Sequence, residues 1–183
     1  MTTLTGRTVF LLWMTCELVA IAQPGRSADS QDARRVRSDS AVIVALLDSG
    51  SRGSATFKQL VLTIEGTDGV VYVRPGKCPG YKIKGCLLHT MSATPEHRYL
   101  WIALDLTGEP VDLMVLIAHE LRHALEILSD RSIRTGRGIF SFYYPNGNPA
   151  ARTVETAAAL ATGAAVRHEL TRNSTGDAGT RKR

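Results

Sequence analysis

The chain has 183 residues, of which 44% are hydrophobic and 21% charged, and its formal net charge is +5. This length suits a single domain with a real core, and the composition excludes the disordered and fibrous classes. Much of the positive charge lies in residues 34–37 and 181–183 without interleaved aromatic residues, so the sequence predicts a mildly basic surface and no nucleic-acid binding.

The N-terminus has the features of an export signal. Arg7 precedes an apolar run from Val9 to Ala22, which ends in the small-x-small pattern Ala20-Ile21-Ala22. A run of about 14 residues is too short to span a bilayer as a helix. Residues 1–22 are therefore predicted to be a signal peptide, cleaved near Ala22, which implies a periplasmic or secreted protein without a stable membrane anchor. The charge of Glu17 inside the run leaves an uncleaved anchor as the alternative.

The rest of the chain divides into three parts. Residues 23–37 are polar and charged without apolar periodicity, and they are predicted to form a linker. The folded domain is predicted over residues 38–172. Residues 173–183 are predicted to be a disordered basic tail.

The first half of the domain is predicted to hold two helices and three strands. The helices span residues 38–47 and 54–64, separated by a break at Gly50–Gly53. Strands are predicted over residues 70–74, 82–91 and 98–106, with a hairpin turn at 93–97. The expected fold is α+β, a small antiparallel sheet packed with helices.

Cysteine usage agrees with export. Cys16 would leave with the signal peptide, so the mature chain keeps only Cys78 and Cys86. These two bracket a turn-rich stretch, and in an oxidising compartment they are predicted to form a disulfide. The alternative is a metal site shared with His89, although the spacing lacks the Cys-x-x-Cys pattern of structural zinc sites.

The segment from Val111 to Leu128 is predicted to be a buried helix, because it is apolar nearly all round and follows a proline suited to a helix start. Within it the chain places the polar residues His119, Glu120 and His123. Buried ionisable groups are costly unless they are paired or bind a metal. The sequence therefore predicts a metal site on this helix.

The spacing of these residues indicates a specific chemistry. His119 and His123 are four residues apart, so both imidazoles lie on one helical face and can hold one Zn²⁺. Glu120 is rotated by about 100° around the helix axis. From there it can reach a zinc-bound water, whose pKa zinc lowers to about 7, and act as its base.

The third metal ligand is predicted to come from the last helix, expected over residues 148–170. Glu155 would lie in the second turn of that helix and is the preferred ligand. Glu126 is the alternative, but it lies seven residues past His119, about 10 Å along the axis, and would have to reach back toward the metal.

The sequence His119-Glu120-Leu121-Arg122-His123, followed by Glu155 on a second helix, resembles the gluzincin branch of the zincin metallopeptidases. The resemblance implies a zinc peptidase with Glu120 as base, a Glu as third ligand and a peptide or protein substrate. It also implies a sheet whose edge strand holds that substrate. Strand 98–106, directly before the motif helix, is predicted to be this edge.

The segment 129–147 is predicted to be a loop that borders the site. Either Tyr143 or Tyr144 in it would donate a hydrogen bond to the oxyanion formed during hydrolysis. Two other classes of function remain open on these residues. One is a non-catalytic exported zinc-binding or interaction module derived from a peptidase. The other is a structural protein whose two histidines only pack in the core.

Overall fold

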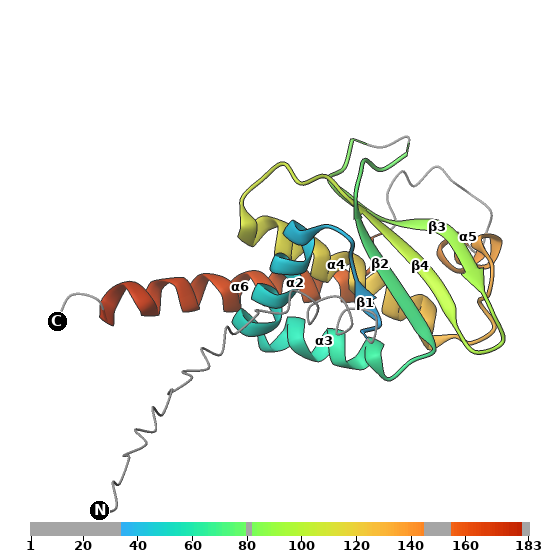
Figure 1. The fold of residues 1–183 in the computed structure, drawn as a ribbon, viewed down its shortest axis with the longest axis horizontal. Coiled ribbons are helices and arrows are strands. Elements are labelled where there is room, and N and C mark those ends of the chain that lie inside the picture. The colour runs from blue at the N-terminus through green and yellow to red at the C-terminus, as the bar shows by residue number, and fades with distance from the viewer. Residues whose placement is uncertain (1–33, 80–81, 145–154, 181–183) are drawn as a thin grey trace, which may run out of the picture.

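The computed structural model describes residues 34–79, 82–144 and 155–180, with residues 174–180 as backbone alone. These residues form an α+β fold in which a four-stranded sheet packs against helices (Figure 1). The predicted α+β class, with a small sheet packed against helices, is therefore confirmed. The predicted signal peptide and residues 23–33 of the linker lie outside the described residues.

The strands are β1 (Val36–Arg37), β2 (Gly69–Pro75), β3 (Gly85–Ala93) and β4 (Arg98–Leu104), in the spatial order β1-β2-β4-β3. The sheet is mixed, and the prediction of an antiparallel sheet is wrong. β1 and β2 pair in parallel, as do β2 and β4, whereas β3 and β4 form an antiparallel hairpin. Parallel strands cannot be joined by a tight turn. Along the chain, two helices separate β1 from β2, and β3 separates β2 from β4. β1 consists of the last two residues of the predicted linker, so the linker prediction is wrong for these two residues.

β4 lies in the interior of the sheet, between β2 and β3, so the prediction that strand 98–106 is the edge is wrong. The prediction of a strand here is confirmed, and its alternate residues Leu100, Ile102 and Leu104 are fully buried. The edge beside the motif helix is β3, which the hairpin turn folds back along β4. A hydrogen bond from the Thr94 N–H to the His97 carbonyl closes that turn.

Two helices connect β1 to β2, namely α2 (Ala41–Gly53) and α3 (Ala55–Glu65). The predicted break at Gly50–Gly53 is wrong because the helix continues to Gly53. Gly50 serves packing there, since a Cβ at this position would lie 2.8 Å from the ring of Phe57. Ser54 caps α3, and its hydroxyl accepts the Phe57 N–H at 3.0 Å.

The second half of the chain forms α4 (Pro110–Ser129), α5 (Gly136–Tyr143) and α6 (Ala157–Thr180). α4 begins at the predicted proline. α5 lies in the segment predicted to be a loop, and the Thr135 hydroxyl caps it by accepting the Gly138 N–H. α6 packs along α4 and continues past the predicted end near Leu170, into the segment predicted to be a disordered tail (Figure 1).

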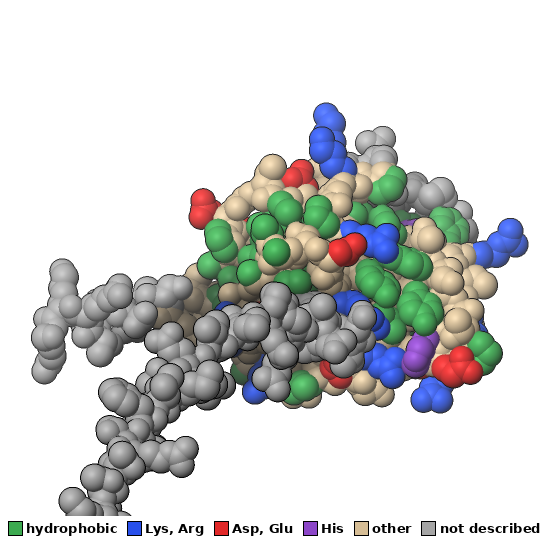
Figure 2. Space-filling view, viewed as in Figure 1, with side chains coloured by type: hydrophobic (Ala, Val, Ile, Leu, Met, Phe, Trp, Pro, Cys, Tyr) green, Lys and Arg blue, Asp and Glu red, His purple; other side chains and the backbone are tan. Residues whose placement is uncertain are grey.

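The two faces of the sheet differ. The helices cover one face, whereas the other carries a ladder of arginine and aromatic side chains. On that second face Tyr72 stacks on Trp101 with ring centroids 6.2 Å apart, and the guanidinium groups of Arg37 and Arg74 lie over the Tyr72 ring. Figure 2 shows hydrophobic and basic side chains side by side on this face, over β2 and β4. The two rings are half-buried, and the guanidinium groups over them make cation–π contacts on this face.

Two further predictions bear on the protein's environment. Cys78 and Cys86 form the predicted disulfide, with their Cα atoms 5.9 Å apart. The cysteines are thereby joined to each other rather than to a metal shared with His89. Among the described helices, none combines the length and the apolar character needed to cross a membrane.

Candidate metal centre

The predicted motif residues lie on α4, which packs against the sheet and is buried along most of its length. Ile117, Ala118 and Leu121 are fully buried, and these contacts fix the rotation of the helix about its axis. The same rotation leaves Glu120 only 6% and His123 only 4% exposed, while His119 lies at the boundary with the cleft. The core packing of α4 therefore orients the three motif side chains.

The side chains of His119, His123 and Glu155 converge. The Nε2 atoms of the two histidines are 3.2 Å apart, and His119 Nε2 lies 3.2 Å from Glu155 Oε2. One nitrogen or oxygen from each of the three residues lies within 4.8 Å of the others, the geometry of a group that can hold a metal ion. All three residues were predicted as ligands.

Two of the three ligand separations are close to those at a tetrahedral metal ion such as zinc, and all three ligand atoms lie within 4.8 Å of one another. A tetrahedral zinc with ligand bonds of 2.0–2.2 Å holds neighbouring ligand atoms about 3.3 Å apart. The two 3.2 Å separations at His119 Nε2 are close to that value. Three protein ligands also leave the fourth position open, as in catalytic rather than structural zinc sites. The donor set of two imidazoles and one carboxylate is one that zinc accepts.

Glu155 reaches the site from a different position than predicted. It lies two residues before α6 begins at Ala157, not in the second turn of that helix. The residues before it, 145–154, where the helix was predicted to begin, lie outside the described residues. α6 packs against α4, and Gly163 faces His119 across this contact, where an added Cβ would lie 3.9 Å from His119 Cβ, an ordinary van der Waals distance.

Glu120, the predicted base, points toward the edge strand. Its Oε2 accepts the backbone N–H of Leu87 at 2.7 Å. Burial raises the pKa of Glu120 to about 7, the Leu87 N–H opposes this shift, and the nearby charge of Glu155 adds to it. A carboxyl group with this pKa can accept and release a proton near neutral pH, as a general base must.

Glu126, the alternative ligand, lies behind His123 rather than in the ligand group. Its Oε2 is 3.1 Å from His123 Nδ1, the ring nitrogen that faces away from His119. Burial lowers the pKa of His123, against the opposing effect of the Glu126 hydrogen bond. The two nitrogens of His123 therefore have different partners, one on each side of the ring.

The two predicted tyrosines have different surroundings. The Tyr143 hydroxyl lies 3.1 Å from the His123 carbonyl oxygen and 3.3 Å from Glu126 Oε2, behind the ligand. Burial and the charge of Glu126 raise the pKa of Tyr143, so its hydroxyl stays protonated. Tyr144 packs against Phe140 and lines the cleft. The oxyanion role stays a prediction for both residues.

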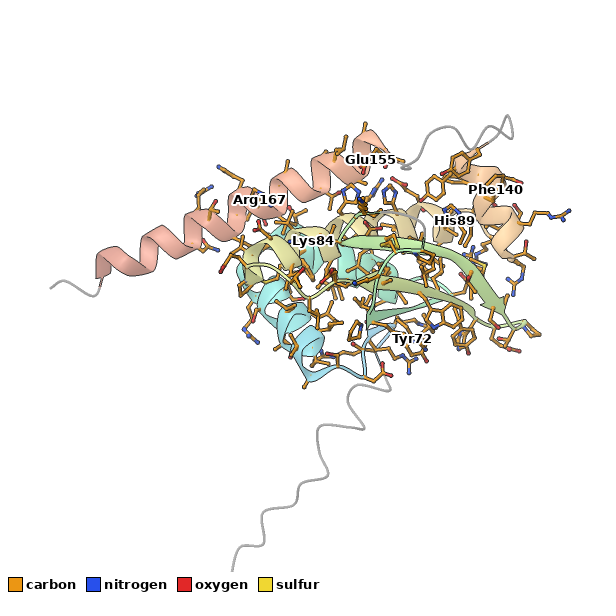
Figure 3. The ribbon with its side chains drawn as sticks, turned by 90° about the horizontal axis from the view of Figure 1, so that it is seen from above. Tyr72, Lys84, His89, Phe140, Glu155 and Arg167 are labelled. Atoms are coloured by element: carbon orange, nitrogen blue, oxygen red, sulfur yellow. A yellow bond between two sulfur atoms is a disulfide. The ribbon has the colours of Figure 1, made fainter. Side chains whose placement is uncertain are left out.

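The candidate ligands open onto a cleft of about 690 Å³ between β3, α4 and the start of α6. On one side of the metal site the cleft wall is aromatic, with His89, Tyr143 and Tyr144. The other side is aliphatic, with Leu116 and Leu160, and Figure 3 shows Lys84 and Arg167 toward this end. Figure 3 also shows Tyr72 on the opposite side of the sheet from Glu155.

No protein-family model, curated protein or solved structure matches this chain. The resemblance to gluzincins accordingly depends on the motif residues themselves.

The sequence interpretation missed three features of the site. It did not identify β3 as the edge strand, the role of Glu126 beside His123, or the hydroxyl of Thr156, which lies 2.7 Å from Glu126 Oε1. The contact between Glu126 and His123 could have been predicted from the sequence. Residues three apart face each other on a helix, so Glu126 had His123 within reach from the spacing alone.

Proposed function

We propose that this protein is an exported zinc-dependent metallohydrolase that cleaves peptide bonds. The observation that carries the proposal is the convergence of His119, His123 and Glu155 within 4.8 Å of one another, beside the buried carboxyl group of Glu120. A bound zinc ion would supply Lewis-acid chemistry at this point, polarising a substrate carbonyl and lowering the pKa of water.

The chain's own groups then have distinct roles. Glu120 accepts a proton from the attacking water and passes it to the leaving amine, for which a pKa of about 7 is suited. Leu87 holds one carboxylate oxygen of Glu120 and thereby fixes its orientation. Tyr143 and Tyr144 both line the cleft, and the Tyr143 hydroxyl contacts the His123 carbonyl oxygen behind the ligand.

The cleft supports an extended peptide as the substrate. β3 is the edge of the sheet and lines the cleft from Gly85 to Thr90. An edge strand presents backbone N–H and C=O groups that can pair with an added strand, while side-chain pockets give selectivity. The aliphatic wall at Leu116 and Leu160 favours an apolar substrate side chain on that side of the bond to be cleaved.

Two features support export. The disulfide between Cys78 and Cys86 is of the kind that persists in oxidising compartments such as the periplasm. The predicted signal over residues 1–22 would deliver the chain to such a compartment.

The test begins with zinc content per chain, measured by elemental analysis on protein from residue 23 onward without a metal-binding tag. About one zinc per chain is expected, because three ligands suffice for a catalytic site. His123→Ala should lose the metal. No zinc in the wild-type protein, even after incubation with zinc, would overturn the proposal.

Hydrolysis is then measured on a library of short internally quenched peptides. Glu120→Gln should keep zinc and lower kcat/KM by roughly 10²- to 10⁴-fold, the usual contribution of a general base. Glu96→Gln, an exposed carboxyl in the β3–β4 turn, is the matched control and should keep both. A wild-type protein that binds zinc but cleaves no peptide would favour the non-catalytic zinc-binding module instead.

A further inference from the structure

We propose that Glu126 is a positioning residue that holds two of the three candidate metal ligands in place. The inference rests on the metal site of the proposed function and adds a residue that does not touch the metal or the substrate. Glu126 lies on α4 three residues past His123, and its side chain is 12% exposed. Both of its carboxylate oxygens have partners, and each partner leads to a different ligand.

The first oxygen fixes His123. Glu126 Oε2 lies 3.1 Å from His123 Nδ1 and, as a carboxylate, can only accept a hydrogen bond. The Tyr143 hydroxyl also lies 3.3 Å from Nδ1, but its single hydrogen has the His123 carbonyl oxygen as an acceptor at 3.1 Å, so the proton of the neutral imidazole is held on Nδ1 by Glu126. The lone pair is left on Nε2, the nitrogen that faces His119 Nε2 at 3.2 Å. Such a carboxylate behind a ligand sets the tautomer and ring orientation and makes the imidazole a stronger donor to the metal.

The second oxygen fixes the chain that carries Glu155. Thr156 donates its hydroxyl hydrogen to Glu126 Oε1 at 2.7 Å, and the same hydroxyl accepts the Ala159 N–H in the first turn of α6. Glu155 precedes Thr156 directly, and its side chain is 46% exposed. A side chain with so little packing depends on its backbone for position. The contact between Thr156 and Glu126 supplies that anchor.

The surroundings of Glu126 keep it in this role. The Tyr143 hydroxyl lies 3.3 Å from Oε2, and Arg122 forms an ion pair with Oε1 at 3.7 Å. The carboxylate is thus engaged from several directions on the side of His123 away from the metal site. This arrangement also explains why Glu126 is a supporting group and not the third ligand.

The test compares Glu126→Gln, Glu126→Ala and Thr156→Val with wild-type protein, and uses Glu96→Gln as the control. Zinc affinity is measured by competition with a chelating dye on the folded protein. Both Glu126 variants should weaken zinc binding by roughly 10- to 100-fold, the usual effect of losing such a partner. Thr156→Val should weaken it less, because His123 keeps its contact, and Glu96→Gln should not change it.

A second readout separates positioning from general stability and does not need the metal. The ¹⁵N chemical shifts of the His123 ring, recorded in metal-free protein above pH 8, report which nitrogen carries the proton. Wild-type protein and Thr156→Val should show the proton on Nδ1, and Glu126→Ala should show a mixture or the opposite tautomer. If wild-type protein binds no zinc, the proposed function fails while this measurement still tests Glu126. An unchanged tautomer and unchanged affinity in Glu126→Ala would overturn the inference.

Discussion

Two buried polar clusters lie at different points along α4, and they differ in how their charges are balanced. One is the Arg98 cluster, made of Arg98, Asp68 and the carbonyl groups at the C-terminal end of α4. Arg98 is fully buried, and its guanidinium donates to Asp68 and to the carbonyl oxygens of Ile127, Leu128, Asp130 and Ile133. The partners of this charge all belong to the chain, and the cation also complements the helix dipole.

The candidate metal site is the second cluster, and its charge is not balanced. Glu120 and Glu155 lie close enough for the charge of Glu155 to raise the pKa of Glu120. No Lys or Arg side chain in the described part of the chain forms an ion pair with either of these carboxylates. A buried charge whose partners lie within the chain supports the fold, whereas two histidines and a carboxylate that converge without such a partner form a group that could hold a metal ion.

The largest effect should come from the Arg98 cluster. Arg98→Met removes the cation and leaves Asp68 and several helix carbonyls without their donor, which should lower the free energy of unfolding by about 3–5 kcal/mol. Urea unfolding monitored by circular dichroism measures this change. The loss should be equal in the presence of zinc and of a chelator, because the cluster does not touch the metal site. A loss below about 1 kcal/mol would show that this cluster is not the structural one.

The second effect concerns Glu120, whose replacement should raise the free energy of unfolding instead of lowering it. In the folded, metal-free protein the pKa of Glu120 is about 7, against an ordinary value of 4.5. The folded state therefore holds the proton more tightly, so ionisation of Glu120 destabilises the fold as pH rises from about 4.5 through 7. Above pH 7 the full cost applies, on the order of 3 kcal/mol, and below pH 4.5 it vanishes. Glu120→Gln removes this cost.

Unfolding of the Glu120→Gln variant in the presence of a chelator tests this expectation. At pH 8 the variant should be more stable than wild-type protein, and at pH 4 the two should be nearly equal. Glu96→Gln is the control, since its carboxyl is exposed and its replacement should leave stability unchanged at both pH values. If wild type and Glu120→Gln differed in free energy of unfolding by the same amount at both pH values, the difference would not come from ionisation of Glu120.

The two clusters also show what the sequence could and could not predict. His119, Glu120 and His123 were predictable because one helix sets their spacing, and the apolar residues around them show that the helix is buried. Arg98 was read only as the start of a strand. Its importance arises from the approach of β4 to the end of α4, a contact between residues 29 to 35 positions apart that no local pattern encodes.

The same reason explains the errors in the sheet and at Glu155. The alternation in residues 98–106 predicts a strand but not its neighbours in the sheet, so the position of β4 between β2 and β3 came only from the structure. Glu155 was predicted as a ligand on a helix, whereas a tertiary contact at Thr156 sets its place just before the helix begins. Patterns within one element were predictable, and the pairing of elements was not.

The smallest effect should come from a third buried polar group, which lies away from both clusters. Ser54 is 2% exposed, and its hydroxyl accepts the Phe57 N–H and donates to Glu169, thereby joining α3 to α6. Ser54→Ala removes the helix cap and should cost about 1 kcal/mol, within the range for such caps. The cost should be the same with and without zinc, as for Arg98. A Ser54→Ala variant that instead lowered zinc affinity would show that α6 transmits strain from this contact to Glu155, and the division between structural and metal-binding polar groups would then fail along α6.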